Sequence, residues 1–328
     1  MRVPGFDALR AAAALAVVLF HYRGVRSPGD AAVDALRQSP AIDAVIAHGF
    51  LGVDVFFFLS GFLLILPWAR SQWAGAPRPT LRDFYARRIR RILPGYYAQL
   101  AFLFGFCLPA FMGLAYVAAN PGLVAYNVAA HALFLQFTTP LSAGSFGLNG
   151  ALWTLTLEAE FYLLLPWIAP HVARNPWRAF VLAVAVAAAW RWAAANDLDA
   201  MVAWQRSLGW RWETSEAAVR DLLQKQLPGY AAHFALGMAL GTAWSRRAPR
   251  PRHIPIIDGA GFAWGARVSY AAYLYHVPLL LLWNRLRILD GSPASLPAFL
   301  FVLAVVSTLS WRVVERPFLA EASRPRRL

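Results

Sequence analysis

The chain has 328 residues, of which 59% are apolar and only 15% carry charge. A soluble domain averages about 45–50% apolar and about 25% charged residues, so this composition excludes an ordinary soluble protein. The net charge of +14 comes from arginines in short runs between apolar segments, the pattern that the positive-inside rule produces. The charge therefore does not indicate a nucleic-acid partner. The single cysteine, Cys107, excludes an internal disulfide and a four-cysteine zinc site.

Apolar segments follow one another along the whole sequence. Several approach or exceed the roughly 17 to 20 apolar residues that a helix needs to cross a bilayer. The sequence therefore predicts an all-α polytopic membrane protein, a bundle of about ten transmembrane helices, in one domain over residues 1–328 with no appended soluble domain. Nine of the crossings are clear in the sequence, at residues 5–22, 49–68, 92–116, 123–137, 151–169, 179–192, 230–244, 270–283 and 296–314.

The distribution of arginine predicts the orientation in the membrane. The connection at residues 69–91 holds seven arginines and one acid, so we expect it in the cytoplasm, and two crossings before it place the N-terminus there as well. The basic tail at residues 323–328 is also expected to be cytoplasmic, which requires an even number of crossings. Because nine is odd, a tenth crossing or a re-entrant hairpin is expected at residues 196–228 or 254–268. The expected location is the inner (plasma) membrane.

The first segment contains two ionisable groups, Arg10 and His21. Their spacing of eleven residues corresponds to about 1100°, so both side chains lie on one helical face, about 16 Å apart along the axis. Such a face normally meets protein or water. An imidazole can exchange a proton near neutral pH, which makes His21 a candidate base. The alternatives are a histidine facing headgroups, and an Arg10 that pairs with Asp7 or extends to the interface.

Two carboxylates in apolar segments are further candidates. Asp54 would cost about 2.5–3.5 kcal/mol near the bilayer centre, so it needs a partner, and Arg10 or His21 is the natural one. Glu158 and Glu160 are two residues apart, so about 200° separates them and they cannot serve one site together. Glu158 shares a face with Tyr162, which makes it the better inward-facing candidate.

Histidine, arginine and glycine patterns add other candidates. His276 shares a face with Ser269, either as part of a site or as a satisfied polar group. Gly237 and Gly241 form a small-xxx-small pair, which typically packs helices. Trp153 is an additional candidate. Arginines three apart at the start of the third segment can grip phosphate oxygens, or can serve topology and headgroup contact; they are Arg87, Arg88, Arg90 and Arg91.

Common soluble-enzyme motifs are missing from the sequence. It has no nucleophile elbow, no phosphate loop, no dinucleotide fingerprint and no H-E-x-x-H, so neither a nucleotide-driven pump nor a metallohydrolase is indicated. Six stretches instead occur in a recognisable order: GFDALRAAAALAVVLFH, FLGVDVFFFLSGFLL, FYARRIRRILP, ALWTLTLEAEFYLLLP, VSYAAYLYHVPLL and VVERPFL.

In this combination and order, the chain resembles the acyltransferase-3 family of membrane O-acyltransferases. The resemblance implies acyl transfer, often of acetyl, from coenzyme A to a hydroxyl of a sugar, glycan, lipid-linked glycan or natural product. It places the family's histidine and its arginine partner on His21 and Arg10. The family's membrane carboxylates fall on Asp54 and Glu158. The chain departs from the family in having less apolar sequence at residues 248–268, and it lacks the extra hydrolase-like domain of some relatives.

The resulting expectation is an intramembrane O-acyltransferase without a metal. His21 would act as base, with Asp54 or Glu158 holding its ring. Acyl-CoA, acetyl-CoA above all, would bind at Arg10 together with the family's Arg-x-x-Arg pair, which falls on Arg88 and Arg91, while Arg87 begins a pair of the same spacing. Membrane lipid is the other expected partner. Two alternatives remain: a transporter or flippase of a glycan or lipid precursor, and a membrane-bound O-acyltransferase of the class whose site would centre on His276.

Overall fold

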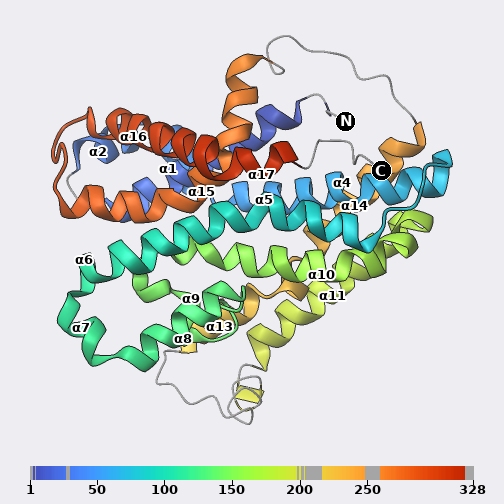
Figure 1. Cartoon of the computed structure of the whole chain (residues 1–328), viewed down its shortest axis with the longest axis horizontal. Helices are drawn as coiled ribbons and strands as arrows, with labels where there is room; N and C mark the ends of the chain where they lie inside the picture. Colours follow the sequence, from blue (N-terminus) through green and yellow to red (C-terminus); the bar gives the residue numbers. More distant parts are fainter. Residues whose placement is uncertain are drawn as a thin grey trace. The chain divides into compact units, whose positions relative to one another are not determined.

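The computed structural model describes residues 3, 5–26, 30–197, 199–200, 203, 216–247 and 259–321. The chain divides into two compact units, each assembled from segments that are distant in sequence. The first unit contains Met1–Phe56, Ala86–Ala119 and Pro251–Leu328, and the second contains Phe57–Tyr85 and Asn120–Arg250. Over the described residues both units contain helices and no strand (Figure 1).

The helices of the first unit come from both ends of the chain and from its middle. They are α1 (Phe6–Val25), α2 (Ala31–Arg37), α3 (Pro40–Ala47), the start of α4 (Leu51–Ala74), most of α5 (Leu81–Phe102), a π-helix (Leu103–Cys107), α6 (Leu108–Met112), α7 (Leu114–Ala119), α15 (Ala260–Arg285), α16 (Ser295–Ser310), a second π-helix (Trp311–Glu315) and α17 (Arg316–Glu321).

The second unit contains the central part of the chain. Its elements are the remainder of α4, α8 (Pro121–Ala132), α9 (Pro140–Ala143), two 3₁₀ turns (Ser145–Gly147 and Gly150–Leu152), α10 (Trp153–Arg174), α11 (Pro176–Asn196), α13 (Glu216–Gln224) and α14 (Leu227–Arg247).

Long apolar helices confirm the predicted class of fold. Five helices among the described residues are long and apolar enough to cross a bilayer. They are Phe6–Val25, Leu51–Ala74, Leu81–Met112, Pro176–Asn196 and Ser295–Leu319. The chain is therefore a helical membrane protein, as its composition predicted.

Several predicted segments differ from the observed helices in their boundaries. The basic connection is mostly helical, because α4 continues to Ala74 and α5 begins at Leu81. Thr80 caps α5 by accepting a hydrogen bond from the Asp83 amide at 3.1 Å, and arginine, a good helix former, continues the helix. The fourth predicted crossing is shorter than expected: α8 ends at Ala132 after 12 residues, about 18 Å, against a hydrocarbon core of about 30 Å.

The positions considered for an extra crossing are only partly described. Residues 260–268 form the first turns of α15 and so lengthen the predicted crossing at 270–283 rather than making a separate one. Residues 254–258, part of 196–228 and the basic tail at 323–328 lie outside the described residues.

In the first unit, α1 and α15 pack side by side and run parallel (Figure 1). A Cβ on Gly265 would lie 2.9 Å from the Ala11 Cβ, which shows how closely the two helices approach there. His21 meets His276 about ten residues further along both helices, and Arg26 meets Asn284 beyond that. The two helices therefore keep one register over most of their length.

The start of α4 packs against α1 in the opposite direction. A Cβ on Gly52 would lie 2.4 Å from the carbonyl oxygen of Ala13, and one on Gly49 would lie 2.2 Å from that of Ala16. Only glycine permits this approach, because any side chain would collide with backbone atoms. The contact fixes the level of the first turns of α4 along α1.

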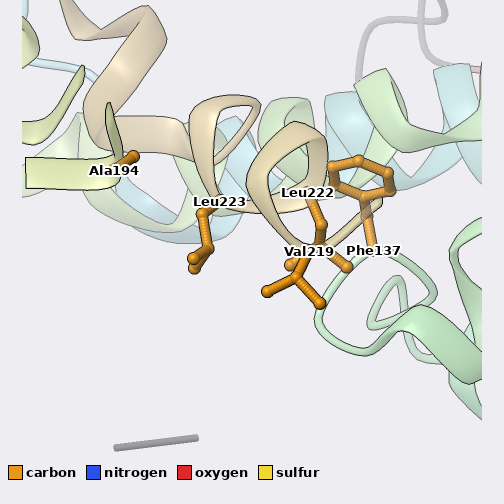
Figure 2. Close-up of a cluster of buried hydrophobic side chains, with 5 residues drawn as sticks. All are labelled: Phe137, Ala194, Val219, Leu222 and Leu223. Atoms are coloured by element: carbon orange, nitrogen blue, oxygen red, sulfur yellow. The ribbon is translucent and has the colours of Figure 1, made fainter. Parts of the chain in front are cut away.

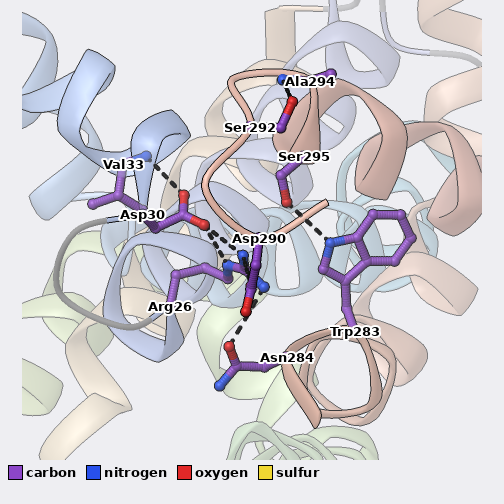
Figure 3. A network of polar contacts seen from close by, with 9 residues as sticks. All are labelled: Arg26, Asp30, Val33, Trp283, Asn284, Asp290, Ser292, Ala294 and Ser295. Carbon is purple, nitrogen blue, oxygen red and sulfur yellow. Dashed lines mark hydrogen bonds and ion pairs between the residues drawn. The ribbon is translucent and has the colours of Figure 1, made fainter. Parts of the chain in front are cut away.

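The C-terminal end of α1 is held by a buried arginine (Figure 3). The Arg26 guanidinium donates to the Asp30 carboxylate at 2.9 and 2.5 Å and to the Asp290 carboxylate at 2.6 Å. Asp30 also caps α2 by accepting from the Val33 amide. Burial lowers the pKa of Arg26, but its hydrogen bonds to the two carboxylates outweigh this and raise it. The network ties α1 to α2 and to the connection that follows α15.

In the second unit, α4 and α14 cross closely and run parallel. A Cβ on Gly237 would lie 2.1 Å from the Phe58 carbonyl oxygen, and one on Gly61 would lie 2.1 Å from that of Phe234. Gly241 meets the Phe62 carbonyl in the same way. The small-xxx-small pair therefore packs helices, as predicted.

Helix α13 is amphipathic and packs its apolar face against the rest of the second unit (Figure 2). Its buried positions follow helical spacing and meet side chains from α11 and from the segment after α8. The cluster contains Phe137, Ala194, Val219, Leu222 and Leu223.

Candidate active site

His21 lies about one turn before the end of α1 and is half-buried. Its Nδ1 is 2.9 Å from the carbonyl oxygen of Val17 and 3.2 Å from Nε2 of His276. The two imidazole rings meet edge to face, with their centroids 4.8 Å apart. The fold thus brings together two histidines that are 255 positions apart in the sequence. Helical spacing within either segment could not have predicted this pairing.

His276 is completely buried in α15, and its Nδ1 lies 2.6 Å from the Tyr273 carbonyl oxygen. Ser269, predicted to share its face, is also buried but donates to the Ala266 carbonyl within the same helix at 2.9 Å. The structure therefore places His276 against His21 and gives Ser269 a bond within its own helix.

Asp54 lies closer to the level of Arg10 than to that of His21. Gly49 meets Ala16 and Gly52 meets Ala13, so the antiparallel register puts Asp54 next to Ala11 along the axis. His21 is ten residues further along, about 15 Å. Of the two partners considered for Asp54, this register favours Arg10. At Nδ1 of His21, the contacts described above are with the Val17 carbonyl oxygen and with Nε2 of His276.

The arginine run on α5 presents two different faces. Arg87 and Arg90 are exposed, whereas Arg88 and Arg91 are half-buried. The Arg91 guanidinium lies 3.8 Å from a carboxylate oxygen of Glu315 and 5.9 Å from the centre of the Tyr270 ring. The spacing alone fitted either pair, and burial distinguishes Arg88 and Arg91 as the pair that faces the protein.

Glu315 is a buried acid that the sequence reasoning did not single out. It ends the second π-helix, is 1% exposed, and neither carboxylate oxygen has a hydrogen-bond partner among the described residues. A Cβ on Gly95 would lie 3.3 Å from its Cγ, so a glycine makes room for it. The sequence could have indicated this acid, because Glu315 is an ionisable residue directly after a long apolar run, within VVERPFL.

The remaining candidates belong to the second unit. Glu158 Oε1 accepts a hydrogen bond from the Ser60 hydroxyl at 3.0 Å and another from the Tyr162 hydroxyl. This confirms that Glu158 and Tyr162 share a helical face. Trp153 packs in an aromatic group, with ring centroids 5.3 Å from Tyr230, and the Lys225 ammonium lies 5.5 Å from its ring centre.

Metal ligands do not cluster in the part of the chain that the structure describes: no group of three histidine, cysteine or acidic side chains there could hold an ion. The chemistry that the described groups offer is proton transfer at an imidazole and binding of anions by half-buried guanidinium groups.

Comparison with known proteins defines the class of this helical membrane protein. Residues 3–266 match the acyltransferase-3 family, described as an acyltransferase domain, and the chain belongs to that family. The predicted membership of an acyltransferase family is thereby confirmed.

Two relatives carry more specific names. The chain is 28% identical over 167 residues to the peptidoglycan O-acetyltransferase OatA of Listeria monocytogenes, covering 50% of this chain and 24% of that protein. It is 28% identical over 179 residues to the O-acetyltransferase OatA of Staphylococcus aureus, covering 51% of this chain and 24% of that protein. The matched region is thus about a quarter of each relative's length. No solved structure matches the chain.

Proposed function

We propose that this chain is an integral membrane O-acyltransferase that moves an acyl group, acetyl in the first instance, from acyl-CoA to a hydroxyl of a glycan. Family membership and the names of the relatives support acyl transfer to an oxygen of a glycan. The observation that carries the proposal is the position of His21, half-buried in α1 with Nδ1 next to a backbone carbonyl and a second imidazole.

The chemical step follows from an imidazole base. His21 takes the proton of the acceptor hydroxyl while the hydroxyl oxygen attacks the thioester carbonyl carbon. The C–O bond forms, the C–S bond breaks, and the thiolate leaves with the electron pair. Because a thiol has a pKa of about 8.5, the thiolate is a good leaving group and does not need strong acid assistance. General-base catalysis of this kind contributes about 10² to 10⁴ in rate.

The donor site in this proposal is on α5 and α1. Arg88 and Arg91 bind the phosphates of coenzyme A, since guanidinium groups suit bidentate contact with phosphate. Arg10 guides the donor's arm toward His21, and Asp54, at the level of Arg10, is its counter-charge. In this proposal the protein lies in the inner membrane, and both termini and the α4–α5 connection face the cytoplasm, where coenzyme A is available.

The acceptor is a hydroxylated sugar, and the relatives make a cell-wall glycan the first candidate. Peptidoglycan appears in the name of the Listeria relative. Acceptor selection in this chain is assigned to the polar connections around residues 23–48 and 196–228. Glu158, which accepts hydrogen bonds from Ser60 and Tyr162, is kept as the second candidate carboxylate for the reaction.

Transfer from labelled acetyl-CoA to a glycan acceptor by the purified protein tests this function. His21→Ala should lower the rate by about 10² to 10⁴, because the base is removed. His171→Ala is the control: His171 is an exposed histidine of α10, and it lies outside the residues assigned to the base, the donor and the acceptor. A folded His21→Ala protein with a near wild-type rate would refute the role of His21.

Binding of the donor separates the enzyme from a transporter or flippase. A ligand that binds only the folded state raises Tm, so saturating coenzyme A should stabilise the protein, and Arg88→Ala with Arg91→Ala should remove the shift. A wild-type protein that shows no shift and no turnover would favour the transporter. Labelled acyl trapped on the protein without acceptor would indicate an acyl-histidine route in place of direct transfer.

A further inference from the structure

We propose that His276 is a positioning residue that holds His21 with its proton on Nδ1, so that Nε2 is the nitrogen that accepts the proton of the acceptor hydroxyl. The proposal rests on the function proposed above, in which His21 is the base. It concerns a different residue on a different helix, and it can fail while the role of His21 stands.

His276 is the more deeply buried member of the pair. Nδ1 of His276 lies 2.6 Å from the Tyr273 carbonyl oxygen, and a carbonyl only accepts, so His276 carries a proton on Nδ1. The contacts of His276 described here include no carboxylate, and a completely buried imidazole in such surroundings stays uncharged, because burying an unpaired charge is very unfavourable. An uncharged His276 with a proton on Nδ1 has only a lone pair on Nε2.

That lone pair determines what His21 can offer. Nδ1 of His21 faces Nε2 of His276 at 3.2 Å and the Val17 carbonyl oxygen at 2.9 Å. Both are acceptors, so Nδ1 of His21 is the donor and holds the proton. The lone pair of uncharged His21 is then on Nε2, since the hydrogen bond at one ring nitrogen sets the state of the other.

The second histidine adds what the backbone contact cannot provide. A carbonyl four residues earlier is present at any helical histidine, and exposed His48 has the same contact with Ala44. His276 contributes a second acceptor and an edge-to-face ring contact from another helix, which together restrict rotation of the His21 ring. When His21 gains the proton, its bond to His276 becomes charge-assisted and therefore stronger.

The packing of the two helices supports this function. Gly265 against Ala11 on one side of the pair, and Arg26 against Asn284 on the other, keep α1 and α15 in register. The pair lies between these two contacts. The distance between the rings is thus set by backbone packing and not by the two side chains alone.

Three substitutions of His276 distinguish positioning from packing. Gln places an amide oxygen near the position of Nε2 and can still accept from His21, whereas Asn can replace only the bond to Tyr273. Leu replaces neither. We expect His276→Leu and His276→Asn to lower kcat by about 10- to 100-fold with little change in the donor KM, as loss of an orienting partner does, and His276→Gln to recover most of that loss.

The proton on His21 can also be observed without turnover. In protein labelled with ¹⁵N-histidine, the His21 signals, identified by their loss in His21→Gln among seven histidines, should show a protonated Nδ1. His276→Gln should preserve that state, and His276→Leu should increase the fraction with the proton on Nε2. A proton on Nε2 in the wild type would overturn the proposal.

The outcomes separate the two proposals. If His21→Ala is inactive but folded His276→Leu has wild-type kcat, the positioning role is wrong and the base stands. If His276→Gln is as slow as His276→Leu while both remain folded, the acceptor role of His276 is also wrong. If His21→Ala is active and His276→Leu is not, His276 is itself the base and both proposals fall.

Discussion

At the scale of single residues, Glu315 is a buried acid whose charge is only weakly balanced by the groups around it. Its carboxylate is almost completely buried, receives no hydrogen bond, and has Arg91 at 3.8 Å. Burying a carboxylate without hydrogen bonds is costly, so a neutral group of the same shape should be tolerated there, the more so because the Arg91 side chain is 28% exposed and can be solvated. Its charge also opposes any anion that binds to Arg91.

We therefore predict that Glu315→Gln leaves Tm unchanged or raises it, and lowers the KM for acyl-CoA several-fold. The physical reason is that the substitution removes a negative charge beside a guanidinium assigned to phosphate. Thermal unfolding in detergent and donor-dependent kinetics measure the two effects. Arg91→Gln is the matched counterpart and should raise the same KM. A Glu315→Gln protein with a raised donor KM would mean that the carboxylate orients Arg91.

At the scale of elements, glycines determine how closely helices approach. Gly237 on α14 has no space for a side chain, because a Cβ there would lie 2.1 Å from the Phe58 carbonyl oxygen of α4. Gly122 in α8 has nothing within 4 Å of the same position, so it serves as a control in the same unit.

Gly237→Ala should force α4 and α14 apart and destabilise the protein by about 1–3 kcal/mol, as overpacking does. Gly122→Ala should be neutral or stabilise by about 0.4–1 kcal/mol, since the backbone there tolerates alanine. Melting in detergent measures both substitutions. Equal stability of the two variants would show that the close approach of α4 and α14 is not required.

The second element-scale prediction concerns the end of α1. Arg26→Met should destabilise the protein by about 3–5 kcal/mol, because it leaves the buried Asp30 carboxylate without a counter-ion. Asp290, whose side chain is 47% exposed, contributes less, and Asp290→Asn should cost about 0–1 kcal/mol. Unfolding of the two variants in detergent measures the difference. A mild Arg26→Met would mean that the network does not hold the end of α1.

At the scale of the whole molecule, contacts within each unit constrain the membrane topology. Because α15 runs parallel to α1, we expect it to cross in the same direction and α16 to return the chain to the side on which α1 began. The end of α4 meets the end of α10, where Trp73 donates to the Ala173 carbonyl at 2.8 Å. We therefore predict eight crossings among the described residues, with residues 123–137 not crossing. Five of them are the helices long and apolar enough to span a bilayer, α1, α4, α5 with α6, α11 and α16, and the other three are α10, α14 and α15.

Cysteine labelling in intact cells tests this topology. Cys107 is buried and can be replaced by alanine to give a background without reactive thiols. We expect Ala74→Cys to be protected from an impermeant reagent and Ala294→Cys to be labelled from outside. Ala118→Cys and Gly144→Cys, before and after α8, should both be labelled from outside. Labelling of only one of these two would show that residues 123–137 do cross.

The sequence by itself determined the class of protein and which residues share a face of one helix. Apolar segments long enough to span a bilayer predicted a helical membrane protein, and six ordered motifs predicted the acyltransferase family. Helical spacing also placed Glu158 and Tyr162 on one face, because residues four apart are neighbours on any helix. These properties are local, so a single sequence contains them.

Only the tertiary structure decided which faces meet. The pairing of His21 with His276, the level of Asp54 beside that of Arg10, and the buried Glu315 near Arg91 each join segments far apart in the chain. Their register depends on where glycines allow two backbones to approach, and periodicity within one helix has no information about its neighbour. The packing of α1 against α15 therefore brings a second histidine against the His21 ring.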